Sequence, residues 1–328
     1  MKFDYSVYGL KVRSEIRLPE LSPSAFTDPD VSIDFKPLPK CLKDGRKIQR
    51  WAEISGTQCM LHVSKRCRFL IENGRYIFID RGAAPGQVEQ INVSDARIRL
   101  LILGTAMGVL LHQRGMVPLH LSSVSCPRGV FGFSGVSGDG KSTLAALMHS
   151  DYKCGMFSDD VAAFDPNCEH TVLKPGPRRL KLWDDALAHL EVSNLGRVQD
   201  LENQPKYQLL LNDVSQIQEA LLEGLIMLER VKPGEKPCLT RLQGVEAFSA
   251  LMGAVYRLNL GLQIHGNLRL MEIVCHLSRT VDIYLFRRRW DLKYLKQDVG
   301  IILSLFGLES AENSGSQEAS LVSPGRSE

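Results

Sequence analysis

The chain has 328 residues, 44% of them hydrophobic, which is enough for one large or two medium domains with a substantial core. The 40 Lys and Arg residues against 37 Asp and Glu give a formal net charge of +3, too small to favour binding to nucleic acid or to an anionic membrane. The eight cysteines include no Cys-x-x-Cys pair, which argues against a zinc site, and the N-terminus lacks an apolar leader. We therefore expect a cytoplasmic protein with reduced thiols.

Residues 1–93 are predicted to form a smaller, β-rich N-terminal domain. Short apolar or alternating runs recur there, and prolines and glycines separate them. The clearest signal is Asn73-Gly74 between the runs 69–71 and 76–79, which is typical of a β-hairpin. Because no catalytic constellation stands out in this part, we expect it to position a partner or to support the second domain.

Residues 94–308 are predicted to form an α/β domain. A buried helix over 95–114, with Ser94 as N-cap, is followed by strands at 117–124 and 129–134. Its apolar stretch, 100–111, is too short to span a bilayer. Further elements are expected as helices at 184–190, 214–222 and 244–258 and as strands at 225–228 and 281–286. Residues 309–328 are rich in Ser, Glu and Gly, and we expect a disordered tail.

The stretch from Gly135 to Ser142 reads GVSGDGKS, a complete phosphate-binding loop between a predicted strand and a predicted helix. Its glycines let successive N–H groups converge on phosphate oxygens, and the helix N-terminus adds its positive dipole end. Lys141 is expected to reach the β- and γ-phosphates, and the Ser142 hydroxyl to ligate Mg²⁺. Asp139 must point away from the phosphates. The residues expected to bind ATP are Gly135, Val136, Ser137, Gly138, Asp139, Gly140, Lys141, Ser142 and Thr143.

The pair Asp159-Asp160 follows the loop helix at the end of a predicted neighbouring strand, so it is expected to face the same crevice. One carboxylate can hold the Mg²⁺ shell while the other accepts the proton of a substrate hydroxyl. Two adjacent like charges also raise one pKa, which would suit a base. The alternative is a solvated turn or a helix cap.

Other polar residues leave two interpretations open. His120, in an apolar run 15 residues before Gly135, is either a satisfied core residue or part of the active site. A basic cluster near the inferred cleft either neutralises substrate charge or forms a solvated loop; it comprises Lys174, Arg178, Arg179 and Lys181. For the run 287–289, a solvated charged face is the default interpretation.

The order of His120, the GxxxxGKS loop and the aspartate pair resembles the catalytic domain of bacterial HPr kinase/phosphorylase over roughly residues 110–165. Leu119–Ser123, Lys141–Ala146 and Leu180–Trp183 look closer still to the HPr-kinase-like proteins encoded with lasso-peptide biosynthetic genes, which phosphorylate a precursor peptide at its C-terminal serine. The resemblance implies a P-loop kinase domain of the HPr kinase / phosphoenolpyruvate-carboxykinase type behind a smaller β-rich domain.

Position by position, the resemblance implies that Lys141 and Ser142 contact phosphate and Mg²⁺, that Asp160 is the general base, and that Asp159 supports the metal. It also makes His120 an active-site residue. The chain departs from the family at 179–185, where a Leu-Glu-Ile-Arg-Gly type segment is missing, so the reverse phosphorylase reaction lacks its expected support. Asp184 or Asp185 would be a second metal ligand or a cap for the following helix.

The sequence therefore predicts an ATP·Mg²⁺-dependent kinase that transfers the γ-phosphoryl group to a hydroxyl, serine above all, of a peptide or small protein such as a lasso-peptide precursor. One alternative is a nucleotide-dependent regulatory or binding ATPase without a phosphorylated product. Another is a kinase of HPr or of a small metabolite. HPr kinases assemble as hexamers, and a homo-oligomer stays open for this chain.

Overall fold

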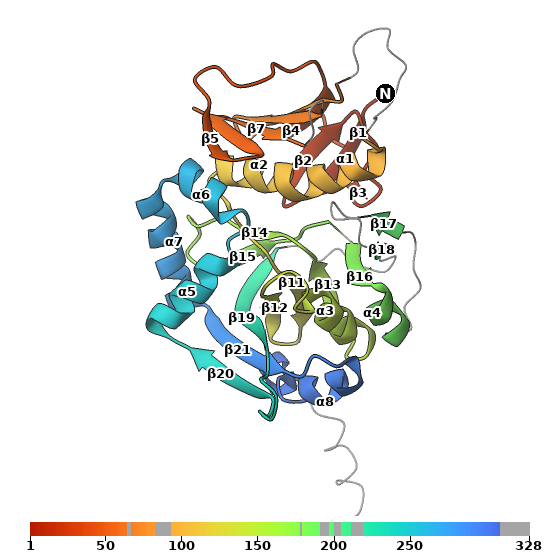
Figure 1. Cartoon of the computed structure of the whole chain (residues 1–328), viewed down its shortest axis with the longest axis vertical. Coiled ribbons are helices and arrows are strands. Elements are labelled where there is room, and N and C mark those ends of the chain that lie inside the picture. Colours follow the sequence, from red (N-terminus) through yellow and green to blue (C-terminus); the bar gives the residue numbers. More distant parts are fainter. Residues whose placement is uncertain are drawn as a thin grey trace, which may run out of the picture.

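The computed structural model describes residues 1–63, 67–82, 93–177, 179–190, 197–199, 205–210 and 219–308, with the backbone alone for 197–199 and 205–210. The expected tail at 309–328, most of the expected helix at 214–222, and Arg178 lie outside these ranges. Across the described ranges, no helix combines the length and the hydropathy needed to cross a bilayer. The fold is a mixed α/β arrangement with two large mixed sheets (Figure 1).

Within the described ranges, nine strands form the N-terminal sheet in the order β3-β1-β2-β4-β9-β8-β7-β6-β5. They are β1 (Phe3–Val7), β2 (Leu10–Ser14), β3 (Ser22–Pro23), β4 (Val31–Phe35), β5 (Arg46–Gln49), β6 (Ala52–Ser55), β7 (Gln58–His62), β8 (Arg68–Glu72) and β9 (Tyr76–Asp80). The expected hairpin is confirmed as β8–β9, with Glu72 opposite Tyr76. Asn73 and Gly74 take φ angles of 56° and 61°, the left-handed values that this turn requires.

The expected buried helix at 95–114 is confirmed as α1 (Asp95–Leu101), a π-helical turn (Ile102–Ala106) and α2 (Met107–Gln113). The Ser94 hydroxyl accepts a hydrogen bond from the Arg97 N–H at 3.2 Å, as expected of an N-cap. The helix lies between the two large sheets (Figure 1). Its apolar side chains share one buried cluster with the N-terminal sheet and with Val161, Tyr256 and Leu260 of the second half. The two halves therefore fold against each other through this helix.

The second large sheet runs β10-β14-β15-β19-β12-β11-β13, with β21 parallel to β19 and β20 antiparallel to β21. Its strands are β10 (Val117–Leu119), β11 (Ser122–Cys126), β12 (Gly129–Ser134), β13 (Gly155–Ser158), β14 (Ala162–Phe164), β15 (Val172–Lys174), β19 (Ala220–Arg230), β20 (Cys238–Leu242) and β21 (Asp282–Arg288). A small third sheet joins β16 (Arg179–Trp183), β17 (Arg197–Gln199) and β18 (Pro205–Leu210). The strands expected at 225–228 and 281–286 are thus confirmed.

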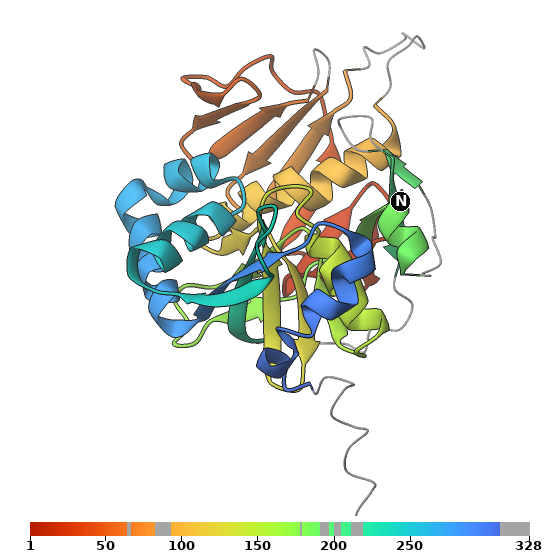
Figure 2. The same cartoon turned by 60° about the horizontal axis from the view of Figure 1, so that its bottom comes forward.

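Helices cover both faces of the second sheet (Figures 1 and 2). They are α3 (Lys141–Ser150), α4 (Asp184–His189), α5 (Gly244–Ala254), α6 (Leu258–His265), α7 (Asn267–Thr280) and α8 (Leu295–Val299). Neighbouring residues of β19 point to opposite faces, so Leu225 packs in the cluster with α5 and α7, whereas Ile226 packs with α3 and α8. This alternation gives the sheet an apolar layer on each face.

Three expected elements differ from the structure. The strand expected at 117–124 is split into β10 and β11, because the backbone N–H of His120 donates to Ala254 instead of to a strand. The expected helix at 214–222 is wrong at its end, where residues 220–222 begin β19. The expected helix at 244–258 ends at Ala254, because Val255 turns to extended backbone and Arg257 to left-handed backbone before α6 begins.

The expectation of reduced thiols is wrong for one pair. Cys126 and Cys154 form a disulfide, with their Cα atoms 5.0 Å apart. Cys126 ends β11 and Cys154 directly precedes β13, and these two strands are paired. The pairing of the strands therefore brings the two cysteines within bonding distance.

Gly108 of α2 provides a test of how the helix packs on the second half. A Cβ at this position would lie 2.6 Å from a ring carbon of Tyr256, so we expect Gly108→Ala to destabilise the protein by about 1–3 kcal/mol through overpacking. Gly253→Ala in α5 is the matched control, because its Cβ would meet nothing within 4 Å and alanine favours helix by up to about 1 kcal/mol. In urea denaturation, the free energy of unfolding should fall for Gly108→Ala and rise for Gly253→Ala. A rise for both variants would contradict this packing.

Candidate active site

The predicted phosphate-binding loop lies between β12 and α3, and its glycines hold backbone angles that other residues rarely adopt. Gly135, Gly138 and Gly140 have φ angles of 149°, 96° and 81°. A Cβ on Gly140 would also collide with the guanidinium of Arg288. The loop therefore requires glycine at these positions, and α3 begins directly after it with Lys141.

Two charged side chains of the loop bond to the loop itself. The Lys141 ammonium donates to the carbonyls of Gly135 and Val136 at 2.9 and 3.1 Å. The Asp139 carboxylate accepts from the Val136 N–H at 2.7 Å, so it folds back onto the loop. Asp139 does not line the adjacent cavity, in keeping with the sequence argument that its charge must avoid the phosphates.

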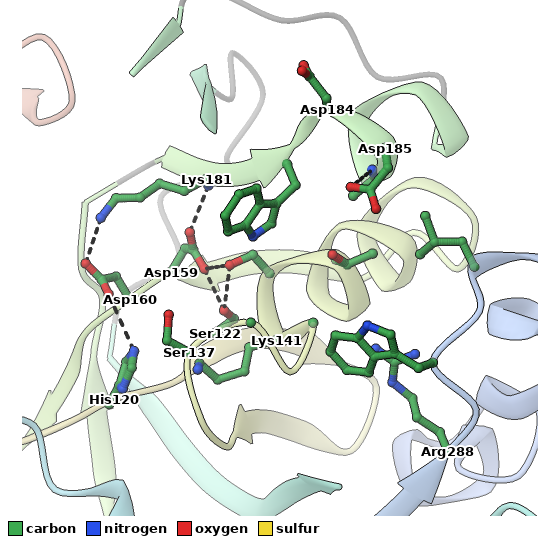
Figure 3. A pocket seen from close by; sticks show the side chains of 18 residues that line it. His120, Ser122, Ser137, Lys141, Asp159, Asp160, Lys181, Asp184, Asp185 and Arg288 are labelled. Atoms are coloured by element: carbon green, nitrogen blue, oxygen red, sulfur yellow. Dashed lines mark hydrogen bonds and ion pairs between the residues drawn. The ribbon is translucent and has the colours of Figure 1, made fainter. Parts of the chain in front are cut away.

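A cavity of about 570 Å³ opens beside this loop (Figure 3). It brings together most of the residues that the sequence singled out, and within the described chain it leaves Gly135, Val136 and Asp139 outside its wall. Its lining consists of His120, Ser122, Ser137, Gly138, Gly140, Lys141, Ser142, Thr143, Asp159, Asp160, Lys181, Trp183, Asp184, Asp185, Ala186, Arg288, Trp290 and Leu292. The loop and the aspartate pair meet because β12 and β13 both run antiparallel to β11, so their carboxyl ends share one edge.

Asp159 is buried and points toward the start of α3. One of its carboxylate oxygens accepts from the hydroxyls of Ser142 and Ser122, at 2.7 and 2.5 Å. The other oxygen accepts from the backbone N–H of Lys181 at 2.9 Å. These contacts fix the carboxylate between the loop helix and β16.

The oxygens of Asp159 and Ser142 fit a Mg²⁺ ion, which prefers hard oxygen ligands and takes several of them from substrate phosphates and water. In the part of the chain that is described, no group of three or more His, Cys, Asp or Glu side chains is placed to hold a metal. Asp184 and Asp185 lie in the first turn of α4, after the N-cap position at Trp183, and both line the cavity. Asp185 accepts from the N–H of Ala186 at 2.8 Å.

Asp160 points the opposite way from Asp159, as Figure 3 shows. Its backbone is left-handed, with φ of 82°, an uncommon value for a residue other than glycine. Its carboxylate accepts from the ammonium of Lys181 at 2.8 Å, and its other oxygen lies 3.7 Å from Nε2 of His120.

The pKa of Asp160 corrects one sequence expectation. Burial raises this pKa, but the positive charges of Lys181 and of its other neighbours lower it by a larger amount. The pKa of Asp160 therefore lies well below its usual range. The adjacent carboxylate of Asp159 therefore does not produce the raised pKa that the sequence argument expected. The reason is that the two side chains diverge, and Asp160 faces a cation instead of its like-charged neighbour.

His120 follows β10 and lies beside the aspartate at the floor of the cavity. Its ring packs edge-on against Tyr256, with 5.7 Å between ring centroids. Burial, together with the nearby charge of Lys141, lowers its pKa to about 4, so the imidazole is neutral at pH 7. The residue is thus both packed and directed at the cavity.

The basic residues near the cavity have different environments. Lys181 lines it, Arg179 is buried behind it, and Lys174 forms an ion pair with Glu219 outside its wall. Arg178 lies outside the described residues. The expectation that the run 287–289 forms a solvated face is wrong for Arg288. This arginine is 3% exposed and donates to the Asp139 carbonyl at 3.3 Å.

Six lining residues were missed by the sequence argument: Ser122, Trp183, Ala186, Arg288, Trp290 and Leu292. Arg288 ends β21, which is parallel to β19 and through it to β12, so its position at the loop edge follows from strand order. Trp290 is 40% exposed, and the guanidinium of Arg230 lies 3.6 Å from the centroid of its ring. A run of arginines directly before a tryptophan at a strand end was the available signal.

The sequence matches no protein-family model and no curated protein. Among solved structures, the alignment with the Hpr(Ser) kinase/phosphatase from Coxiella burnetii covers 57% of this chain and 89% of the Coxiella chain. The two chains share 13% sequence identity at a TM-score of 0.28. A likeness at this level carries no argument about fold family or function, so the function of this chain has to be inferred from the cavity itself.

The lowered pKa of His120 predicts a pH-dependent part of the stability. The unfolded imidazole titrates near 6.5 and the folded one at about 4, so the unfolded state binds more protons between these values and stability falls as the pH drops through this range. From pH 7 to pH 5 we expect wild type to lose about 1–2 kcal/mol more than His120→Gln, measured by urea denaturation. The exposed His170→Gln is the control and should keep the wild-type slope. An unchanged slope in His120→Gln would contradict the assignment.

Proposed function

We propose that this chain is an ATP·Mg²⁺-dependent kinase that transfers the γ-phosphoryl group to an alcohol, serine above all, of a peptide or small protein. The observation that carries the proposal is the placing of Asp160 on the wall of the cavity that also holds Lys141 and the Ser142–Asp159 pair. A phosphate-binding loop alone serves many classes of protein. A second carboxylate that is free of the metal position is what a transfer to an alcohol additionally needs.

The nucleotide has a site along the whole cavity. The N–H groups of the loop and the N-terminus of α3 suit the phosphates, and Lys141 can exchange its two carbonyl contacts for phosphate oxygens. Ser142 and Asp159 would hold Mg²⁺, whose chemistry when bound is to neutralise phosphate charge. Arg288, next to the loop, is placed to contact phosphate, and the ring of Trp290 offers a face on which a nucleobase can stack.

Asp160 would act on the acceptor. As the acceptor oxygen forms its bond to the γ-phosphorus and the bond to the β-phosphate oxygen breaks, the hydroxyl proton passes to the Asp160 carboxylate. A carboxylate of low pKa is a weak base, but the hydroxyl becomes strongly acidic as its bond to phosphorus forms. Its main contribution before that point is orientation, and the contacts with Lys181 and His120 hold it in place.

The finer assignments depend on the sequence. The motif resemblance supports a P-loop domain of the HPr kinase / phosphoenolpyruvate-carboxykinase type and, as acceptor, a lasso-peptide precursor. The division into residues 1–93 and 94–308 stays a prediction, because the helix at 95–113 packs against both halves.

Asp160→Asn tests the proposed base. Asparagine keeps the shape and tolerates left-handed backbone, so we expect the fold and nucleotide binding to be kept while the transfer rate falls by about 10²–10⁴-fold. The measurement is the intact mass of candidate serine peptides after incubation with ATP and Mg²⁺, where each phosphoryl group adds about 80 Da. Asp165→Asn, an aspartate outside the cavity, is the control and should behave as wild type.

Two outcomes would count against the proposal. Full activity of Asp160→Asn would show that another group takes the proton. Formation of ADP by the wild type without mass gain on any peptide would favour the alternative of a regulatory ATPase.

A further inference from the structure

A second cavity of about 410 Å³ adjoins the nucleotide cavity. The two share His120, Ser137 and Asp160, so the proposed base lies at their boundary. The second cavity contains no other part of the phosphate-binding loop, and neither Ser142 nor Asp159 lines it. It therefore meets the nucleotide cavity at the proposed base, away from the proposed metal position.

The walls of this second cavity come from both halves of the chain. Trp51 belongs to the turn between β5 and β6 of the N-terminal sheet, and Tyr256, Arg257 and Leu258 belong to the junction of α5 and α6. The wall combines aromatic and apolar side chains with a larger share of polar surface, and Arg257 is the one arginine or lysine among its described residues. Such a wall suits a polar ligand that carries an anionic group and some apolar surface.

Arg257 is held in position by several contacts. Its guanidinium donates to the Thr105 hydroxyl at 2.7 Å and lies 5.0 Å from the centroid of the Trp51 ring. Among the described residues, no carboxylate forms an ion pair with it. A cation stacked on an aromatic face and lacking a counter-ion is available to an incoming anion.

The backbone at this position supports the same view. Arg257 has φ of 54°, a left-handed conformation that costs a large residue of order 1 kcal/mol and that glycine would adopt without strain. Asp160, which lines the same cavity, is left-handed as well. Strained backbone of this kind concentrates at binding and catalytic sites, where the position of the side chain matters.

We propose that the second cavity binds the acceptor, an acidic peptide. Arg257 would bind a carboxylate close to the acceptor serine of this peptide, and Trp51 would pack against the peptide backbone. This inference rests on the proposed kinase function and adds the class of substrate. It also gives the N-terminal sheet a role, because Trp51 lies on an element far in sequence from the phosphate-binding loop. Arg257 is thereby a residue that determines specificity, while Asp160 acts on the hydroxyl.

Binding of labelled peptides tests the inference without depending on turnover. Two pools of short fluorescein-labelled peptides carry one serine, flanked by aspartate in the first pool and by asparagine in the second. Fluorescence anisotropy is read with full-length protein in the presence of Mg²⁺ and a non-hydrolysable ATP analogue. We expect the aspartate pool to bind wild type about tenfold more tightly than the asparagine pool, which is the effect of one charge-assisted hydrogen bond.

Arg257→Gly should remove this preference, and KM for aspartate peptides should rise about tenfold with kcat little changed. Lys153→Gly is the matched control, because Lys153 is also an exposed cation on left-handed backbone, with φ of 58°, and should leave both values as in wild type. Arg257→Asn, which tolerates the same backbone, should repeat the result of the glycine variant. Thermal unfolding checks that all variants are folded.

Each outcome distinguishes the two proposals. Equal binding of both pools to wild type, or a preference that survives in Arg257→Gly, would overturn the assignment of the second cavity. Peptide binding that depends on Arg257 but gives no phosphorylated product would leave the acceptor site in place and would refute the kinase function instead.

Discussion

The site depends on two adjacent carboxylates, Asp159 and Asp160, that point in different directions (Figure 3), with Asp160 on left-handed backbone. Extended backbone also sends neighbouring side chains to opposite faces, and the turn directly after β13 keeps the two apart, with Asp159 against Ser142 and Asp160 against Lys181 and His120. In the proposed function, one carboxylate serves a metal position and the other the acceptor. Side by side, the two charges would repel and share a single site.

Lys181 links the two carboxylates, since its N–H binds Asp159 and its ammonium binds Asp160. Burial and the neighbouring Arg179 lower the pKa of Lys181, whereas its own charge helps to keep Asp160 ionised. Strand β16 thus carries much of the electrostatic balance of the site. His120 completes it as a neutral imidazole, because a third cation next to Lys141 and Lys181 would be costly in this half-buried position.

Local signals in the sequence were sufficient for the glycine-rich loop and for several turns and caps. The glycines and Lys141 of the loop, the Asn73-Gly74 hairpin and the N-cap at Ser94 each follow from short-range backbone chemistry, and the structure contains all of them. Positions set by long-range pairing could not be predicted in this way. Ser122 and Arg288 reach the cavity only because of the order of strands β11, β12, β19 and β21, and the break of the chain near Val255 depends on Tyr256 packing against α2. The direction of the pKa of Asp160 was missed for the same reason, since its partner Lys181 lies on a different sheet.

The most direct test of the central claim is a crystal structure of the protein with Mg²⁺ and a non-hydrolysable ATP analogue. The account predicts that Asp159 and Ser142 face the metal, and that a carboxylate oxygen of Asp160 lies within hydrogen-bonding reach of an alcohol placed for in-line attack on the γ-phosphorus. Asp160 turned away from the γ-phosphate in every nucleotide-bound copy, or phosphates bound away from the loop between β12 and α3, would contradict it.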